Sequence, residues 1–373
     1  MSEWKEMKLQ EVLDFGNGKV KPKNQGDIPI YGGNGILGYG DDANYTGETI
    51  VIGRVGAYCG AVYYENRPIW VSDNALSAKP KGKNNTKFLY YFLRHNNLNQ
   101  WAGGSSHPLV TQTLLNSLEF SICSNPNTQT AIASILSSLD DKIELLHRQN
   151  TTLEKMAETL FRQWFVEEAK EDWEKFELGQ LIEINGGFSY KGEYIGTGEA
   201  LLLGMGCVSF QDRFLTNGAR PYSGDCPEKY LVNPNDLVVA TRQQSDNLPI
   251  LGFPAIIPPE FKGKKVIVGA NLYRVKNNTQ IDNYLFYLIL RSAEYRQHIL
   301  ASSKGSTVRM ITKDAIEKYK IAFPPKEGIE NLMQLLKPIN EKSITNQTQI
   351  LTLTALQDTL LPKLMRGEVT VEP

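Results

Sequence analysis

Three features of this sequence have the residue types from which catalytic or cofactor sites are built. Glycines 33, 35 and 38 have the spacing of a dinucleotide-binding loop, but polar residues 39–42 follow them where such a loop leads into a helix, so we interpret them as turns. The four histidines (95, 107, 147 and 298) are scattered, and the four cysteines form no close pair. The sequence therefore predicts no metal cluster, redox motif or catalytic histidine–cysteine pair.

Motifs of nucleotide-hydrolysing and DNA-modifying enzymes are also missing from the sequence. No glycine loop ends in Gly-Lys-Ser/Thr, no Asn-Pro-Pro-aromatic element for amino-methyl transfer is present, and no Pro-Asp is followed by Glu-x-Lys for metal-dependent nuclease chemistry. We therefore expect that the chain is not an enzyme and holds no cofactor or metal of its own.

Composition and charge narrow the class of protein further. The chain has 373 residues and a net charge of −1, and neither a signal peptide nor an apolar run long enough to cross a bilayer is evident. We expect a reduced, cytoplasmic protein.

Charge is unevenly distributed along the chain. Residues 1–126 carry 12 basic and 11 acidic side chains and residues 173–326 carry 19 and 15, whereas residues 127–172 carry 5 and 9. Any contact with a polyanion is therefore expected in the two net-positive segments, with modest, salt-sensitive affinity.

The sequence contains an internal repeat. Residues 4–9 (WKEMKL) recur as residues 173–178 (WEKFEL), and residues 15–18 (FGNG) match residues 184–187 (INGG) at the same offset. Gly-Ser-Ser at 104–106 returns as Gly-Ser-Thr at 305–307, and each half ends in a long apolar repeat. A tandem duplication with little identity keeps one scaffold while its two working surfaces diverge.

Both globular segments combine strand and helix signals. In the first half, residues 28–31, 49–52, 61–64 and 69–71 are predicted to be strands, and residues 88–94 a buried helical turn. In the second half, the predicted strands are residues 200–203, 237–240 and 266–268, and the predicted helix is 284–291. Both parts are expected to be mixed α/β, with a strand order that the sequence does not give.

A long helix follows each globular segment. The first has an unbroken seam of steps of four and three, which predicts a helix of ~36 residues and roughly 54 Å: Ile132, Leu136, Leu139, Ile143, Leu146, Asn150, Leu153, Ala157, Leu160 and Trp164. The second has the same seam 200 residues later: Leu332, Leu336, Ile339, Ser343, Asn346, Ile350, Leu353, Gln357, Leu360 and Leu364. Helices of this length pair with one another, and polar residues in the seam can fix their register. Pro338 is expected to kink the second helix or to mark its start, and Pro362 to end it early.

These features predict an α+β protein with a pseudo-twofold tandem repeat. Its expected parts are globular domains at 1–126 and 171–326, a central helical spacer at 127–170 and a C-terminal one at 327–373. Because the helices follow successive copies of one domain, an antiparallel coiled coil is the simplest packing.

The whole chain resembles the specificity subunit of type I restriction–modification systems. The most specific pieces are the domain ends with the helices that follow them. Residues 118–122 lead into QTAIASIL at 129–136 and LDDKI at 139–143, and that helix closes with LEKM at 153–156 and LFRQWF at 160–165. In the second half, YKIAFPP at 319–325 precedes the helix, which closes with LLPKLMRGEV at 360–369.

This resemblance implies a division of labour between subunits. Each globular part would be a target recognition domain that reads one half of a split, asymmetric sequence in double-stranded DNA. The helices would hold the two domains apart and dock two modification subunits. Those partners bind S-adenosylmethionine and methylate adenine, and separate restriction subunits use ATP and Mg to move and cleave DNA. The chain itself would be non-catalytic.

Residue types suggest which side chains would contact DNA. Base edges are read by Arg, Lys, Asn, Gln, Ser and Thr, and phosphates are held by Lys and Arg. The candidates in the first domain are Lys19, Lys21, Lys23, Arg54, Ser105, Ser106 and His107. Those in the second are Tyr190, Lys191, Arg242, Gln243, Gln244, Lys304, Ser306, Thr307 and Arg309. The loop at 304–309 and its counterpart at 104–107 suggest a repeated contact, such as one to phosphate.

Two other functions remain open from the sequence. One is an autonomous DNA methyltransferase or nuclease whose site has no recognised motif. The other is a coiled-coil adaptor or glycan-binding protein, in which aromatic residues such as Tyr63, Tyr64, Trp70 and Tyr90 would stack on sugars. Co-purification with a methyltransferase subunit would distinguish a specificity subunit from these two other functions.

Overall fold

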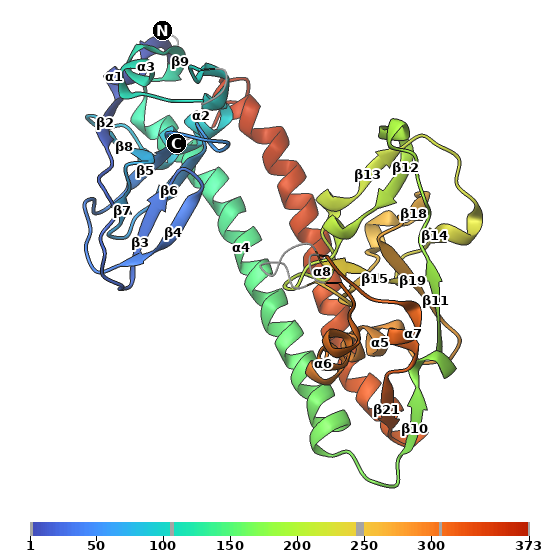
Figure 1. Cartoon of the computed structure of the whole chain (residues 1–373). Coiled ribbons are helices and arrows are strands. Elements are labelled where there is room, and N and C mark those ends of the chain that lie inside the picture. The colour runs from blue at the N-terminus through green and yellow to red at the C-terminus, as the bar shows by residue number, and fades with distance from the viewer. Residues whose placement is uncertain (1–2, 105–107, 244–249, 306–307, 372–373) are drawn as a thin grey trace. The chain divides into compact units, whose positions relative to one another are not determined.

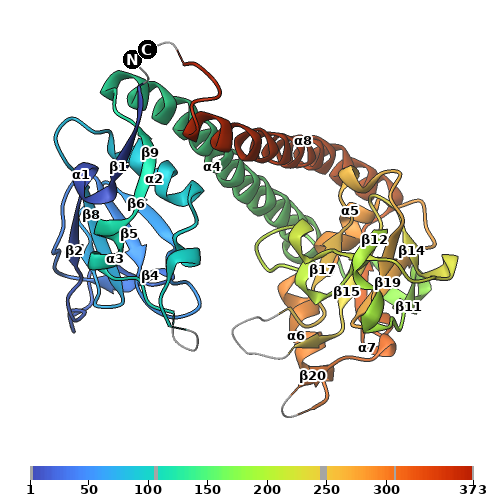
Figure 2. The same cartoon turned by 90° about the horizontal axis from the view of Figure 1, so that it is seen from above.

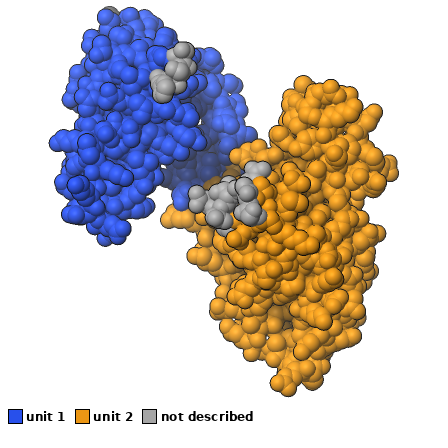
Figure 3. All heavy atoms as spheres, in the orientation of Figure 1, with its two compact units in different colours: residues 1–144, 351–373 blue, residues 145–350 orange. Residues whose placement is uncertain are grey.

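The computed structural model describes residues 3–104, 108–243, 250–305 and 308–371. It divides into two compact units, one made of residues 1–144 and 351–373 and the other of residues 145–350 (Figure 3). Each unit holds one globular part together with a segment of each long helix, α4 (Pro126–Arg162) and α8 (Lys326–Met365) (Figure 1). Among the described residues, no helix has the length and apolar character that crossing a membrane requires.

The globular part of the first unit is built on an antiparallel sheet with the strand order β2-β8-β5-β6. A second sheet has the order β4-β3-β7, and β1 pairs with β9. The strands are β1 (Trp4–Lys8), β2 (Leu13–Asn17), β3 (Ile28–Gly32), β4 (Gly35–Gly40), β5 (Thr49–Gly53), β6 (Val62–Glu65), β7 (Trp70–Val71), β8 (Ala75–Pro80) and β9 (Glu119–Cys123). The helices are α1 (Leu9–Val12), α2 (Thr86–His95) and α3 (Gln112–Ser117). The four strands and the helix predicted for this half are confirmed, and the glycines at 33–38 form the β3–β4 hairpin.

The globular part of the second unit has the corresponding sheets. They have the orders β11-β19-β15-β17 and β13-β12-β18-β14, with the pairs β10-β21 and β16-β20. The strands are β10 (Glu174–Glu177), β11 (Ile182–Gly186), β12 (Ile195–Leu203), β13 (Arg220–Tyr222), β14 (Leu231–Val232), β15 (Leu237–Ala240), β16 (Arg242–Gln243), β17 (Pro254–Ile256), β18 (Val266–Val268), β19 (Leu272–Asn277), β20 (Arg309–Met310) and β21 (Lys320–Phe323). The helices are α5 (Asn283–Ile289), α6 (Ala293–Ser302) and α7 (Lys313–Glu317).

The predicted repeat is confirmed at the level of single hydrogen bonds. Gly18 donates its N–H to the Ala75 carbonyl, and the bridge from Lys19 to Ser72 follows. In the second unit, the bridge from Phe188 to Gly269 occupies the same place after Gly187. A β-carbon on Gly18 would lie 1.7 Å from the Ser72 carbonyl oxygen, and one on Gly187 would lie 2.0 Å from that of Gly269. Both copies therefore need glycine there, because two stretches of backbone touch.

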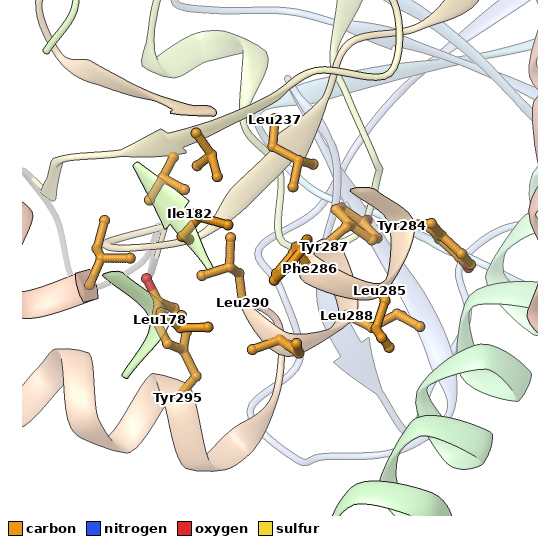
Figure 4. Packing of buried hydrophobic residues seen from close by; sticks show 14 of the residues in the cluster. Leu178, Ile182, Leu237, Tyr284, Leu285, Phe286, Tyr287, Leu288, Leu290 and Tyr295 are labelled. Atoms are coloured by element: carbon orange, nitrogen blue, oxygen red, sulfur yellow. The ribbon is translucent and has the colours of Figure 1, made fainter. Parts of the chain in front are cut away.

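Each unit buries its helix segments in the core of its own globular part. In the first unit, Ile132 and Leu136 of α4 and Leu364 of α8 join the core of α2 and the sheet. In the second unit, Leu332 and Leu336 of α8 do the same, around the aromatic residues of α5 that Figure 4 shows. Apolar burial of this kind is the main force that holds a globular part to its helices.

The long helices pair antiparallel, as the repeat predicts (Figure 2). In the first unit, Gln357 Nε2 donates to Asp140 Oδ1 at 2.7 Å, and in the second, Asn346 Nδ2 donates to Asn150 Oδ1 at 3.0 Å. Within the second unit alone, Arg213 joins Glu154 of α4 to Asn340 of α8, so numbers that rise along α4 from Asn150 face numbers that fall along α8 from Asn346. Helix α4 begins with Pro126 in its first turn, and Asn125 Oδ1 accepts the N–H of Asn127.

The structure excludes two of the outcomes expected at prolines of α8, a start at Pro338 and an early end at Pro362. Helix α8 begins at Lys326, so Pro338 does not mark its start, and it continues past Pro362 to Met365. A proline within a helix costs about 3 kcal/mol. Leu336 and Ile339 are buried on either side of Pro338, whose own ring is exposed. Burying two such side chains contributes about 3–6 kcal/mol, which offsets the missing hydrogen bond.

Candidate nucleic-acid interface

The second globular part presents a small β-ribbon on which four of the predicted DNA-contacting residues meet, Arg242, Gln243, Lys304 and Arg309. Strand β16 pairs with β20 so that Arg242 lies opposite Met310, and Lys304 lies opposite Met310 on the other side. Residues directly opposite one another project from the same face of a sheet. Arg242, Met310 and Lys304 therefore form one exposed surface, which we call the ribbon face. Met310 is 41% exposed although it is apolar.

Arg309 lies on the same ribbon but belongs to its other face. It pairs with Gln243, one residue out of step with the ribbon face, and its side chain is exposed whereas that of Gln243 is buried. The ribbon is shaped by Gly305, which has a φ of +102° that other residues rarely adopt. The structure thus brings Arg242, Gln243, Lys304 and Arg309 together, although at least 61 residues separate the first two from the last two in sequence. Gln243 is buried, so its side chain is not open to DNA.

The first globular part has the same backbone frame with different side chains. Leu109 bridges to Gly103 on one side and to Val55 on the other, and Gly104 has a φ of +89°. The hydrogen bonds match as well, because Val110 donates to the carbonyl of Arg54 as Ile311 donates to that of Thr241. Val55, Leu109 and Gly103 thus stand where Arg242, Met310 and Lys304 stand in the second copy. This face is uncharged, and Val55 is 38% exposed.

Three further candidates, Lys19, Lys21 and Lys23, follow β2 and are all exposed. The carbonyl of Lys19 accepts a hydrogen bond from Trp70 Nε1, and its N–H donates to the Val71 carbonyl. The backbone of this segment is therefore anchored at Lys19, and the side-chain charges remain available to solvent or to a polyanion.

Two of the other described candidates, Arg54 and Tyr190, are half-buried. Arg54 is half-buried, and its Nε lacks a hydrogen-bond partner among the described residues. Tyr190 is half-buried against the cluster around Tyr222, and its hydroxyl accepts a hydrogen bond from Arg220 Nη2 at 3.4 Å. Lys191 is exposed. The candidates Ser105, Ser106, His107, Gln244, Ser306 and Thr307 lie outside the described residues.

The residues predicted for the helix interface lie on the inward faces of α4, of the turn that directly follows it, and of α8. None of them is exposed, and about half are buried. On α4 they are Ile132, Leu136, Leu139, Ile143, Leu146, Leu153 and Leu160, and Trp164 lies in the π-helical turn Gln163–Glu167 that follows α4. On α8 they are Leu336, Ile339, Ile350, Leu353, Leu360 and Leu364.

Polar contacts fix the first globular part to its helices. Tyr91 of α2 donates its hydroxyl to Asp140 Oδ2 at 2.5 Å, while Asp140 Oδ1 accepts from Gln357 of α8. One carboxylate therefore joins three helices. Burial, together with the hydrogen bond to Asp140, holds the pKa of the Tyr91 phenol far above its usual range, so it remains a donor.

In the second unit, two buried arginines make the corresponding connection. Arg213 forms an ion pair with Glu154 of α4 and donates from Nη1 to Asn340 of α8 at 2.6 Å. Its guanidinium also lies 4.6 Å from the ring centre of Tyr284. Arg291 pairs with Glu158 of α4 at 2.9 Å and donates to the Tyr287 hydroxyl. Buried charges of this kind require such partners.

Sequence reasoning did not single out these arginines. Their carboxylate partners lie 59 and 133 residues away, and no local pattern connects them. Both pairs line a cavity of about 880 Å³ between the second globular part and its helix segments. The charged side chains of these two ion pairs hold the second globular part to its helix segments.

The aromatic residues considered for sugar stacking pack within the first unit. Tyr64 lies 5.9 Å from Tyr90 between ring centres, and Tyr63 lies 6.1 Å from Tyr31. The Tyr64 hydroxyl donates to Glu48, and all of these rings are at least half-buried. Their packing accounts for their presence without a ligand.

Comparison with known proteins agrees with this architecture. The sequence model of the family described as "Type I restriction modification DNA specificity domain" matches residues 1–155 and again residues 170–361. The fold is similar to that of the S subunit of a type I restriction–modification system from M. genitalium, with a TM-score of 0.65 and 18% identity over 97% of this chain and 96% of that one.

Two relatives are similar over most of their length. The specificity subunit of the type I restriction enzyme MjaIX from Methanocaldococcus jannaschii is 26% identical over 345 residues, which cover 84% of this chain and 76% of the relative. The specificity subunit of the type I restriction enzyme HindI from Haemophilus influenzae is 24% identical over 356 residues, which cover 76% of this chain and 77% of the relative. With two family matches that together span most of its length, the chain belongs to the type I restriction–modification DNA specificity family.

Proposed function

We propose that this chain is the DNA-recognition subunit of a type I restriction–modification complex and that it reads a two-part, asymmetric site. Residues 1–126 would bind one half of the site and residues 171–326 the other. The observation that carries the proposal is the pair of equivalent ribbons. Their backbone hydrogen bonds match, whereas Arg242 replaces Val55 and Lys304 replaces Gly103. One scaffold with two different exposed surfaces suits two different half-sites.

A fixed spacing between half-sites requires each reader to be held firmly. Asp140 holds the first globular part to both helices, and Glu154 and Glu158 hold the second. Half-sites read from one face of DNA lie about one helical turn, ~34 Å, apart or a multiple of it. Helices such as α4 and α8 can act as a spacer where a flexible linker cannot.

The same proposal assigns the chemistry to partner subunits. Two modification subunits would dock on the helices and supply S-adenosylmethionine and adenine methylation, and restriction subunits would supply ATP- and Mg-dependent cleavage. The outer faces of the helices support two equivalent docking sites. Ile135 and Met156 of α4 are 36% and 49% exposed, and Leu335 and Leu356, 200 residues later on α8, are 48% and 43% exposed. Exposed apolar residues repeated in this way favour two copies of one partner.

Mapping methylated adenines in cells that express this chain with its modification subunit tests the proposal. We expect a two-part motif with a constant spacer. Replacing residues 1–126 with the corresponding segment of another family member should change one half of the motif and leave the other half and the spacer intact. A change in both halves would contradict the proposal, as would methylation of DNA by the purified chain alone with S-adenosylmethionine.

A further inference from the structure

The ribbon face of the second globular part has the dimensions and chemistry of a groove-reading surface. Met310 exchanges both backbone hydrogen bonds with Lys304, at 2.9 and 2.8 Å, so the two Cα atoms are roughly 5.5 Å apart. Arg242 lies opposite Met310 on the other side, at roughly 4.5–5.5 Å. Two cations therefore flank one apolar side chain across roughly 10 Å, which fits within the ~12 Å width of the DNA major groove.

The chemistry of Met310 distinguishes reading of bases from contact with phosphate. A thioether side chain neutralises no phosphate, and at 41% exposed Met310 presents apolar surface between two cations. The edges of bases in the major groove include apolar groups, above all the thymine methyl, and arginine pairs there with guanine. We propose that the ribbon face enters the major groove of the half-site read by the second globular part, where Arg242 and Met310 contact base edges and Lys304 contacts a base edge or the adjoining phosphate.

This inference rests on the proposed function and goes further in two respects. It names Met310 as a specificity-determining residue, which the sequence did not suggest. It also states that the two copies read DNA differently, because the equivalent face of the first copy, Val55, Leu109 and Gly103, is uncharged. Reading by the first copy then depends more on apolar contacts and on residues elsewhere, such as Lys19, Lys21 and Lys23.

The first test maps adenine methylation directed by the full complex carrying Arg242→Gln. We expect relaxed recognition at one base pair of the second half-site, with discrimination reduced roughly tenfold to hundredfold, and an unchanged first half-site. Arg309→Gln is the comparison, because it removes the same charge from the other face of the same ribbon; as a phosphate contact, Arg309 should affect all sequences alike and its loss should relax recognition at no base pair. Equal relaxation by Arg309→Gln, or an unchanged second half-site with Arg242→Gln, overturns the inference.

The second test separates the groove from the phosphates. In binding of the full complex to a synthetic duplex carrying the mapped site, Met310→Ala should weaken discrimination in the second half-site a few-fold and leave the salt dependence unchanged. Joint Arg242→Gln and Lys304→Gln substitutions should reduce the slope of log K against log[salt] by about 2 if both cations lie near phosphates, and by less if Arg242 is committed to a base. Unchanged discrimination with Met310→Ala overturns insertion into the groove.

Two further readouts keep the outcomes distinct. The thermal unfolding midpoint of each variant should equal that of the wild type, because all three side chains of the ribbon face are exposed. Lys262→Gln, an exposed charge of the same unit outside the ribbon, should leave the methylated motif unchanged. A wild-type complex that methylates no two-part motif overturns the proposed function itself. A two-part motif that is insensitive to Arg242 and Met310 overturns only this inference.

Discussion

Asn346 donates from Nδ2 to Oδ1 of Asn150 at 3.0 Å, and this bond crosses the seam between α8 and α4. Asn346 is completely buried, and its own Oδ1 has no partner among the described residues. Gln149 is a second acceptor for the same amide at 3.2 Å. A buried amide pair lowers stability but permits one register in preference to others. It lies in the second unit.

We predict that substitutions at this pair are strongly non-additive. Asn150→Leu alone should destabilise the chain by about 1–3 kcal/mol, because the buried amide of Asn346 loses an acceptor. Asn150→Leu combined with Asn346→Leu should be at least as stable as the wild type, because an apolar pair replaces a partly satisfied polar one. Urea unfolding of the full chain measures both. Additive losses in the double variant would show that the amides contribute net stability.

The same double variant is expected to lose its unique helix register. Ser134 of α4 and Lys363 of α8 are exposed and belong to the first unit, where the helices also run antiparallel. Spin labels at these two positions should report one short distance in the wild type and a broader distribution in the double variant. An unchanged distribution would mean that apolar packing alone fixes the register.

Replacing only one partner of the Arg213–Glu154 ion pair should reduce stability more than replacing both partners. Both side chains are nearly buried, so Arg213→Met leaves an uncompensated carboxylate and should cost about 3–5 kcal/mol. Arg213→Met with Glu154→Leu should recover most of this loss. Arg162 and Glu167 form an exposed pair in the same unit, and Arg162→Met should change stability by about 1 kcal/mol or less. Denaturant unfolding of the three variants tests the ranking.

Much of the scaffold follows from the sequence because its signals are local or repeated. The helix seams, the strands at 49–52 and 237–240 and the duplication depend on periodicity, and periodicity survives divergence. Buried Asn346 and Ser343 were also expected from their seam positions and are at most 2% exposed. The continuation of α8 past Pro362 was not expected, because tertiary burial of Leu364 and Met365 outweighs the local cost of that proline.

The candidate site is less predictable, because its geometry comes from pairing between distant segments. Arg242 and Arg54 each follow a strand in sequence, but the structural counterpart of Arg242 is Val55. This shift of one residue moves a side chain to the other face of a strand, and only strand register reveals it. Strand pairing also determines the position of Met310. Methionine is a residue type expected in the core, but here it lies exposed between two cations.

Gly18 and Gly187 should be equally intolerant of a side chain, since both permit a crossing of backbone in their copy of the repeat. Gly18→Ala places a β-carbon 1.7 Å from the Ser72 carbonyl oxygen, and Gly187→Ala places one 2.0 Å from that of Gly269. Backbone has to move in both variants, at a cost of at least about 2 kcal/mol each. Gly38→Ala is the control, because nothing lies within 4 Å of its β-carbon. Comparable unfolding midpoints for all three variants would contradict this account.

The stability of the first unit should depend on pH through His95. Burial, and secondarily the charge of Arg366, lowers the pKa of His95 below its ordinary value of 6.5. The unfolded chain therefore binds this proton more readily than the folded one, and stability falls as pH drops below about 6.5. One group contributes at most about 1.4 kcal/mol per pH unit. His95→Gln should flatten the difference in unfolding free energy between pH 7 and pH 5.5, and Arg366→Gln should flatten it in part. Parallel pH profiles for the wild type and His95→Gln would show that His95 is protonated equally readily in both states.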